Sequence, residues 1–130
     1  MKLSFLLLIT LTVLQSCATK TDQNSALMTI FDDYKEYVMR NFPEGATYEG
    51  DHRFDDRLTD ISLKADSQRL DSIQNFVTRM KSIDTTLLSK ENKMNCKLVY
   101  SMFRETIESE KFQYNLIPLT QQDGIHIGFP

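Results

Sequence analysis

Acidic and basic side chains crowd, together with one histidine, into residues 51–60. Carboxylate oxygens and an imidazole nitrogen are metal ligands, so a cation site is one hypothesis for this segment. The spacing does not fit a calcium loop, because arginines stand at two places where an oxygen ligand is required. The candidate ligands are Asp51, His52, Asp55, Asp56 and Asp60, and with Arg53 and Arg57 they make up a possible cleft or structural loop.

Two other interpretations of residues 51–60 remain open. The alternation of acids and arginines suits a self-paired structural loop, in which the acids accept hydrogen bonds from backbone N–H groups and the arginines make forked contacts. We prefer this structural interpretation to a metal site. In the third interpretation, the loop borders the substrate cleft of a larger protein.

The second histidine, His126, lies between Gly124 and Gly128. Glycines allow the backbone to approach a ligand closely, so His126 is a second candidate binding residue. The simpler interpretation is an ordinary hydrogen-bonded side chain whose partner lies in chain beyond Pro130. Two separated histidines and no C-x-x-C pair do not complete a tetrahedral zinc site, so we assign no catalytic, cofactor or metal residue.

The first 16 residues have the pattern of a bacterial lipoprotein signal peptide. Lys2 supplies the positive start, and residues 3–14 form an apolar run of about a dozen residues, whereas a membrane span needs roughly 20. The run ends in LQSC at residues 14–17, which resembles the motif cut by the lipoprotein signal peptidase. We therefore expect Cys17 to carry lipid, such as palmitate. The chain would be lipid-anchored in the bacterial cell envelope, at the outer membrane or facing the periplasm, and Ala18 favours the outer membrane.

The two cysteines and the net charge argue against a disulfide bond and against a nucleic-acid partner. With Cys17 acylated, Cys96 has no disulfide partner, and its position in an expected helix indicates a small, half-buried thiol. The mature chain keeps all 18 acidic residues but loses Lys2 from the 15 basic ones, so its formal charge is −4. Nucleic-acid binding needs a clustered positive surface, so no nucleic-acid partner is expected.

Three stretches of the chain carry apolar residues at helical spacing. They follow a polar segment at residues 17–25 that has no apolar period and is expected to be a tether. The expected helices cover residues 27–42, 63–83 and 89–112, with Ser25, Ser62 and Ser89 as N-caps, and Pro43 ends the first of them. The pattern predicts an all-α fold of three amphipathic helices. The core face expected for the third helix holds Met94, Leu98, Val99, Met102 and Phe103.

The last segment, residues 115–130, is rich in apolar residues but has no helical period. A natural C-terminus seldom ends in this way, because exposed termini are usually polar or tied down. We therefore expect residues 26–130 to be the N-terminal helical portion of a larger, mostly helical domain. The irregular apolar tail would then pack against a C-terminal chain that is missing here.

Two parts of the sequence carry a recognisable pattern. The first runs from FDDY at residues 31–34 through Pro43 to ATYEGDHRFDDRLTD at 46–60, and the second is YNLIPLTQ at 114–121 followed by DGIH at 123–126. They resemble the bacterial family catalogued as domain of unknown function 885, whose members are often lipoproteins and look like zinc metallopeptidases. The likeness covers essentially all of the chain after the tether. It implies a protein several times longer, with zinc held by a His-Glu-x-x-His helix far downstream.

Neither His52 nor His126 begins a His-Glu-x-x-His pattern, so no catalytic residue of the family can be transferred to this chain. Two classes of function stay open. In the first, the chain is the noncatalytic N-terminal segment of a lipid-anchored zinc peptidase and helps to wall a cleft for a peptide substrate. In the second, it belongs to a noncatalytic helical lipoprotein that binds a partner or peptide at the envelope. The coding region beyond Pro130 distinguishes the two.

Overall fold

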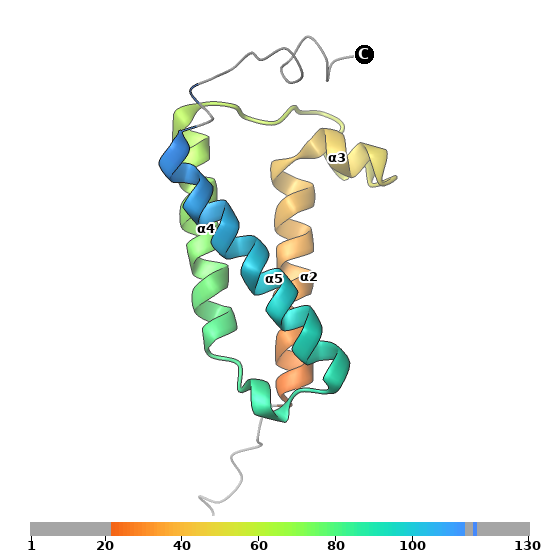
Figure 1. The fold of residues 1–130 in the computed structure, drawn as a ribbon. Coiled ribbons are helices and arrows are strands. Elements are labelled where there is room, and N and C mark those ends of the chain that lie inside the picture. Colours follow the sequence, from red (N-terminus) through yellow and green to blue (C-terminus); the bar gives the residue numbers. More distant parts are fainter. Residues whose placement is uncertain (1–21, 114–115, 117–130) are drawn as a thin grey trace, which may run out of the picture.

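The computed structural model describes residues 22–113 and 116, and these form an all-α structure without strands (Figure 1). Its body consists of three long helices, α2 (Gln23–Asn41), α4 (Leu63–Lys81) and α5 (Lys90–Ser109). Helix α5 runs diagonally across the other two and packs mainly against α4. The predicted all-α fold is confirmed.

The second and third helices begin where the sequence predicted. The Ser62 hydroxyl accepts a hydrogen bond from the Ala65 N–H (3.2 Å), and the Ser89 hydroxyl accepts one from the Asn92 N–H (3.1 Å). These caps satisfy backbone donors that have no partner inside the first turn. Helix α4 ends two residues before the predicted end at residue 83, and α5 continues as a 3₁₀ helix at Glu110–Phe112.

The first helix begins earlier than predicted. Its N-cap is Asp22, whose carboxylate accepts from the backbone N–H groups of Asn24 (3.1 Å) and Ser25 (3.3 Å), so the predicted cap at Ser25 is wrong. Residues 23–25 therefore belong to α2 and not to the tether predicted at 17–25. Asp, Asn and Ser all suit a cap, and periodicity cannot choose among neighbours of this kind.

Several sequence predictions fall outside the described residues. These are the signal peptide, the lipidation site Cys17, the first part of the tether, His126 and the apolar tail apart from Leu116. Leu116 itself donates its backbone N–H to the Gln113 carbonyl oxygen (2.9 Å) and is half exposed.

A short helix that periodicity did not predict follows the first one. Pro43 ends α2 as expected and also begins α3 (Pro43–Tyr48), where its missing N–H is no loss because first-turn donors lack helical partners anyway. After α3 the chain turns through Gly50, whose φ of 86° is strained for any residue with a side chain. A 3₁₀ helix at His52–Phe54 follows and buries the Phe54 ring.

The core lies among α2, α4 and α5. Phe103 (1% exposed) and Leu27 (0%) are its most deeply buried large side chains. The Tyr34 ring packs edge-on against the rings of Phe103 (4.7 Å between centroids) and Phe76 (5.4 Å). Aromatic pairs in this geometry contribute beyond the apolar area they bury, so this cluster holds the three helices together.

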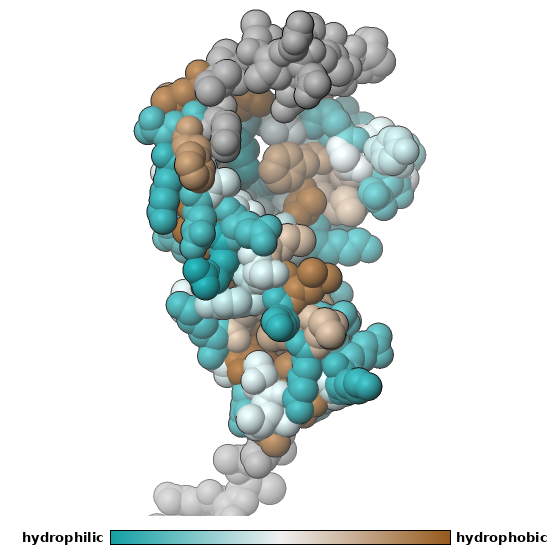
Figure 2. Space-filling view, in the orientation of Figure 1, coloured by the Kyte–Doolittle hydropathy of each residue, from teal (hydrophilic) through white to brown (hydrophobic). Residues whose placement is uncertain are grey.

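The buried face of helix α5 only partly matches the predicted one. Phe103 is in the core and Val99 packs against it, but Met94 and Leu98 are 67% and 63% exposed, and Met102 is also exposed. The helix carries a second stripe, and this one packs against the other helices; it holds Cys96, Tyr100, Phe103 and Ile107. Figure 2 views the side of the bundle that α5 crosses and shows hydrophobic side chains at its surface among hydrophilic ones.

Candidate functional site: a polar loop and cleft beside α2

Arg53 ties the predicted loop to helix α2. Its guanidinium group contacts the Asp51 carboxylate (2.6 and 2.9 Å) and forks over the Glu36 carboxylate (2.8 and 3.2 Å). Asp51 also accepts from the Arg53 backbone N–H (3.2 Å) and so caps the 3₁₀ helix. The hydrogen bond from Arg53 lowers the pKa of Asp51 to about 2 and lowers the pKa of Glu36 as well. For these residues the structure has the pairing that the structural interpretation predicted.

The other acids of the loop are also engaged. Asp55 accepts a hydrogen bond from the Thr47 hydroxyl (2.5 Å) and lies 2.9 Å from His52 Nδ1. Both contacts, that of Thr47 first, lower the pKa of Asp55. Asp56 makes only a long contact with Arg57 (3.4 Å), and both side chains are well exposed, so that pair adds little to stability.

Further bonds join the end of the loop to α3 and α4. Glu44 of α3 accepts from the Thr59 backbone N–H (3.0 Å) and hydroxyl (2.5 Å). The Asp60 carboxylate accepts from the Ser62 N–H (2.9 Å), and the Asp60 carbonyl oxygen accepts from Arg69 (2.8 Å). Within residues 22–113, no three His, Cys, Asp or Glu side chains come together as a metal site requires.

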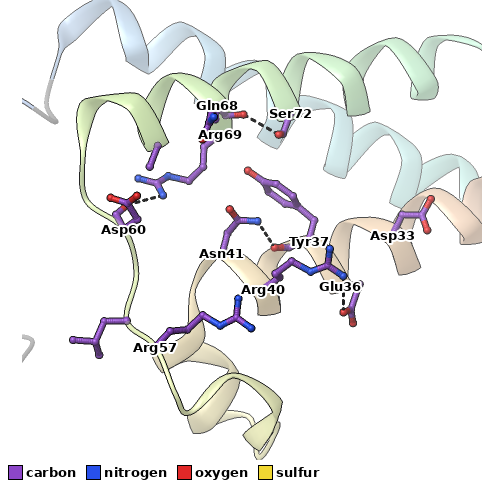
Figure 3. A pocket seen from close by; sticks show the side chains of 12 residues that line it. Asp33, Glu36, Tyr37, Arg40, Asn41, Arg57, Asp60, Gln68, Arg69 and Ser72 are labelled. Carbon is purple, nitrogen blue, oxygen red and sulfur yellow. Dashed lines mark hydrogen bonds and ion pairs between the residues drawn. The ribbon is translucent and has the colours of Figure 1, made fainter.

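A polar cleft of about 610 Å³ opens between α2 and α4, with the end of the loop along one side (Figure 3). Arg57 reaches from the loop toward α2, while Arg69 of α4 points toward Asp60. The lining comes from three elements: Asp33, Glu36, Tyr37, Arg40 and Asn41 of α2; Ala65, Gln68, Arg69 and Ser72 of α4; and Arg57, Leu58 and Asp60 of the loop.

Tyr37 stands in the wall of this cleft with its hydroxyl group buried. The hydroxyl oxygen has no well-formed hydrogen bond among the described residues. Burial raises the pKa of Tyr37, and nearby Ser72 and Arg69 offset part of the rise. The Ser72 hydroxyl donates to the Gln68 carbonyl oxygen instead (2.8 Å).

Polar side chains from all three elements line the cleft. Its described lining contains no histidine or cysteine that could serve as a nucleophile or its base. Glu36 and Asp60 have lowered pKa values, so at neutral pH they are ionised acceptors and not general acids. Amide and guanidinium groups supply hydrogen-bond donors to the cleft, and carboxylates supply acceptors.

The predicted loop residues contribute unequally to this surface. Arg57, and Asp60 beside it, line the cleft, whereas Asp51 and Arg53 line a separate hollow of about 350 Å³ on the other side of Glu36. The helical part of the lining was missed, because polar residues on α2 and α4 have the pattern of any solvent-facing helix surface. Nothing in their spacing could have marked them.

We expect Arg53→Gln to raise the pKa of Asp51 from about 2 toward its usual 3.8, because the main cause of the depression is the Arg53 side chain. Because the pKa of Asp51 is lower in the folded protein than in the unfolded chain, the pairing stabilises the folded protein at pH values above the unfolded pKa of 3.8. This stabilisation is lost as the pH falls toward 2. Carboxyl chemical shifts followed by NMR between pH 1.5 and 6, roughly the range that spans both values, measure this directly. Arg57→Gln is the matched control and should leave Asp51 unchanged; an equal effect of both would refute the pairing.

None of the helices in the described part of the chain is both long and apolar enough to span a bilayer. Comparison with protein-family models, with curated proteins and with solved structures found no match to this chain.

Proposed function

We propose that the chain is the noncatalytic, N-terminal helical segment of a lipid-anchored bacterial envelope protein that resembles the zinc-metallopeptidase-like family named above. The observation that carries this proposal is the LQSC motif after a short apolar run, followed at once by a folded domain. Helix α2 is already capped by Asp22, so only residues 18–21 separate the lipidated Cys17 from the bundle. Zinc and peptide hydrolysis, in this proposal, belong to chain downstream of Pro130.

The second candidate is a noncatalytic helical lipoprotein that binds a peptide or protein partner at the envelope. The polar cleft between α2 and α4 favours it, since side chains that donate and accept hydrogen bonds line the cleft. A His-Glu-x-x-His sequence and a further acidic ligand in the coding region after Pro130 would select the first candidate. A stop codon or a region without that motif would select the second.

Lipid attachment is tested by metabolic labelling with a radioactive or clickable fatty acid. The wild-type chain should incorporate the label, and Cys17→Ser should incorporate none, because the lipid is bonded to that sulfur. Cys96→Ser is the matched control and should be labelled like the wild type, since Cys96 is buried in α5. Labelling that survives in Cys17→Ser would disprove lipid anchoring at this residue.

A further inference from the structure

Three lysines line one hollow at the end of the bundle where α4 finishes. Lys81 is the last residue of α4, and Lys93 and Lys97 are one turn apart on α5. The hollow has a volume of about 420 Å³, and its lining also holds the hydroxyl-bearing residues Thr85 and Tyr100. It is therefore a surface with three ammonium groups and two hydroxyls grouped around one space.

No carboxylate of the described chain lies within ion-pair distance of the three lysines of this hollow. None of the three lysines makes an ion pair there, and no acidic residue lines the hollow. The adjacent Asp84 uses its carboxylate to cap the next turn, accepting from the Thr86 N–H (3.0 Å) and hydroxyl (2.6 Å). Three unpaired cations in one place favour an anionic ligand.

Apolar side chains accompany the lysines on the same end of the molecule. The wall of the hollow includes Met80 and Ile83. Leu87 (49% exposed) lies in the 3₁₀ helix between α4 and α5, and Met94 (67%) follows Lys93 on α5. Basic groups beside exposed apolar side chains are typical of surfaces that rest on the headgroup region of a membrane.

This end of the bundle holds the start of α2, the first described helix after Cys17 in the sequence. Figure 1 shows that the start of α2, the end of α4 and the start of α5 lie together, away from α3. Hydrogen bonds hold them there: the Gln23 side chain accepts from the Asp84 N–H (2.8 Å), and the Asn24 side chain accepts from the Ser89 N–H (3.0 Å). Asp22 is five positions after Cys17, and five extended residues reach at most about 17 Å. A lipid on Cys17 would keep this end close to the bilayer.

We propose that the hollow of Lys81, Lys93 and Lys97 binds the phosphate headgroup of an anionic phospholipid in the membrane that carries the anchor. The proposal rests on lipid anchoring at Cys17. The three lysines neutralise the phosphate. The Thr85 and Tyr100 hydroxyls line the same hollow and can donate hydrogen bonds to it. The exposed side chains of Leu87 and Met94 contact the boundary between headgroups and acyl chains. The bundle would thereby lie against the membrane by its α4–α5 end, with α3 and the polar cleft farther from the bilayer.

The test uses the mature chain from residue 17 with Cys17→Ser, so that binding is independent of the anchor. It is floated with vesicles of phosphatidylcholine alone or with added phosphatidylglycerol. Binding should require phosphatidylglycerol and weaken with salt. The triple variant Lys81→Gln, Lys93→Gln, Lys97→Gln should bind about a hundredfold more weakly, since each lysine at an anionic surface strengthens binding roughly fivefold. All three side chains are exposed, and thermal melting checks that the fold is kept.

The matched control is Lys35→Gln, Lys64→Gln, Lys111→Gln, which removes the same charge from exposed lysines outside the hollow. It should retain most of the binding; an equal loss in both triple variants would overturn the proposal in favour of net charge alone. The proposal would also be overturned if the chain did not bind vesicles that contain phosphatidylglycerol. Calorimetry with inorganic phosphate then shows whether the hollow is a site for the free anion. Failure of fatty-acid labelling, in contrast, disproves the anchor and leaves the vesicle result standing.

Discussion

Replacing Phe103 with alanine should lower the free energy of unfolding by about 4 kcal/mol, because truncating a buried aromatic side chain typically costs 3–5 kcal/mol. Phe103 is 1% exposed, and its ring contacts those of Tyr34 (4.7 Å between centroids) and Phe76 (6.0 Å). The substitution therefore leaves a cavity where α2, α4 and α5 meet. Domains of this size have total stabilities of about 5–15 kcal/mol, so much of the margin would be lost.

Urea unfolding followed by circular dichroism measures this loss. Met102→Ala is the matched control: Met102 precedes Phe103 on α5 but is 46% exposed, so its truncation should change stability by well under 1 kcal/mol. If the two variants are destabilised equally, Met102 is buried as deeply as Phe103. That outcome would restore the core face expected from the sequence, which included both residues.

The sequence correctly predicted features that depend on neighbouring residues in the chain. Ser62 and Ser89 cap the next residues along the chain, and apolar spacing along α4 marks a single buried face. Both signals depend on residues within one or two helical turns, so they are visible without knowing the fold. The short helix α3 was missed for the same reason, since six residues are too few to show a period.

What the sequence could not predict depends on how the helices meet. Helix α5 has two apolar stripes, and only the neighbouring helices decide that the one with Phe103 and Cys96 is buried. In the candidate site, the fork from Arg53 to Glu36 joins positions 17 residues apart. Elsewhere in the bundle, Arg79 of α4 pairs with Asp33 of α2 across 46 residues. Alternating charges in the loop predicted that Arg53 would pair with carboxylates but could not identify Glu36 as a partner. The sequence could not predict the cleft or the lysine hollow either, because the residues that line each of them come from separate elements.

The misplaced start of the first helix has a measurable consequence. Ala26 is the predicted start of the folded part. A chain that begins there lacks Gln23 and Asn24, which hydrogen-bond to the two ends of the connection between α4 and α5. Gln23 accepts from the Asp84 N–H (2.8 Å), and Asn24 accepts from the Ser89 N–H (3.0 Å) and the Asn92 side chain (2.9 Å). Deleting them leaves the backbone N–H groups of Asp84, just after α4, and Ser89, at the start of α5, without these partners.

We therefore expect the chain that begins at Ala26 to be less stable than one that begins at Asp22 by at least about 2 kcal/mol. A net hydrogen bond contributes roughly 1 kcal/mol, and at least two such bonds between distant segments are lost. Loss of the Asp22 cap adds to this cost, because Ala26 offers no side-chain acceptor to replace it. Urea unfolding of both chains gives the difference, with a chain that begins at Ala18 as the control. The control should match the Asp22 chain. If all three chains unfold at the same urea concentration, residues 22–25 behave as tether, and the boundary predicted from the sequence is the correct one.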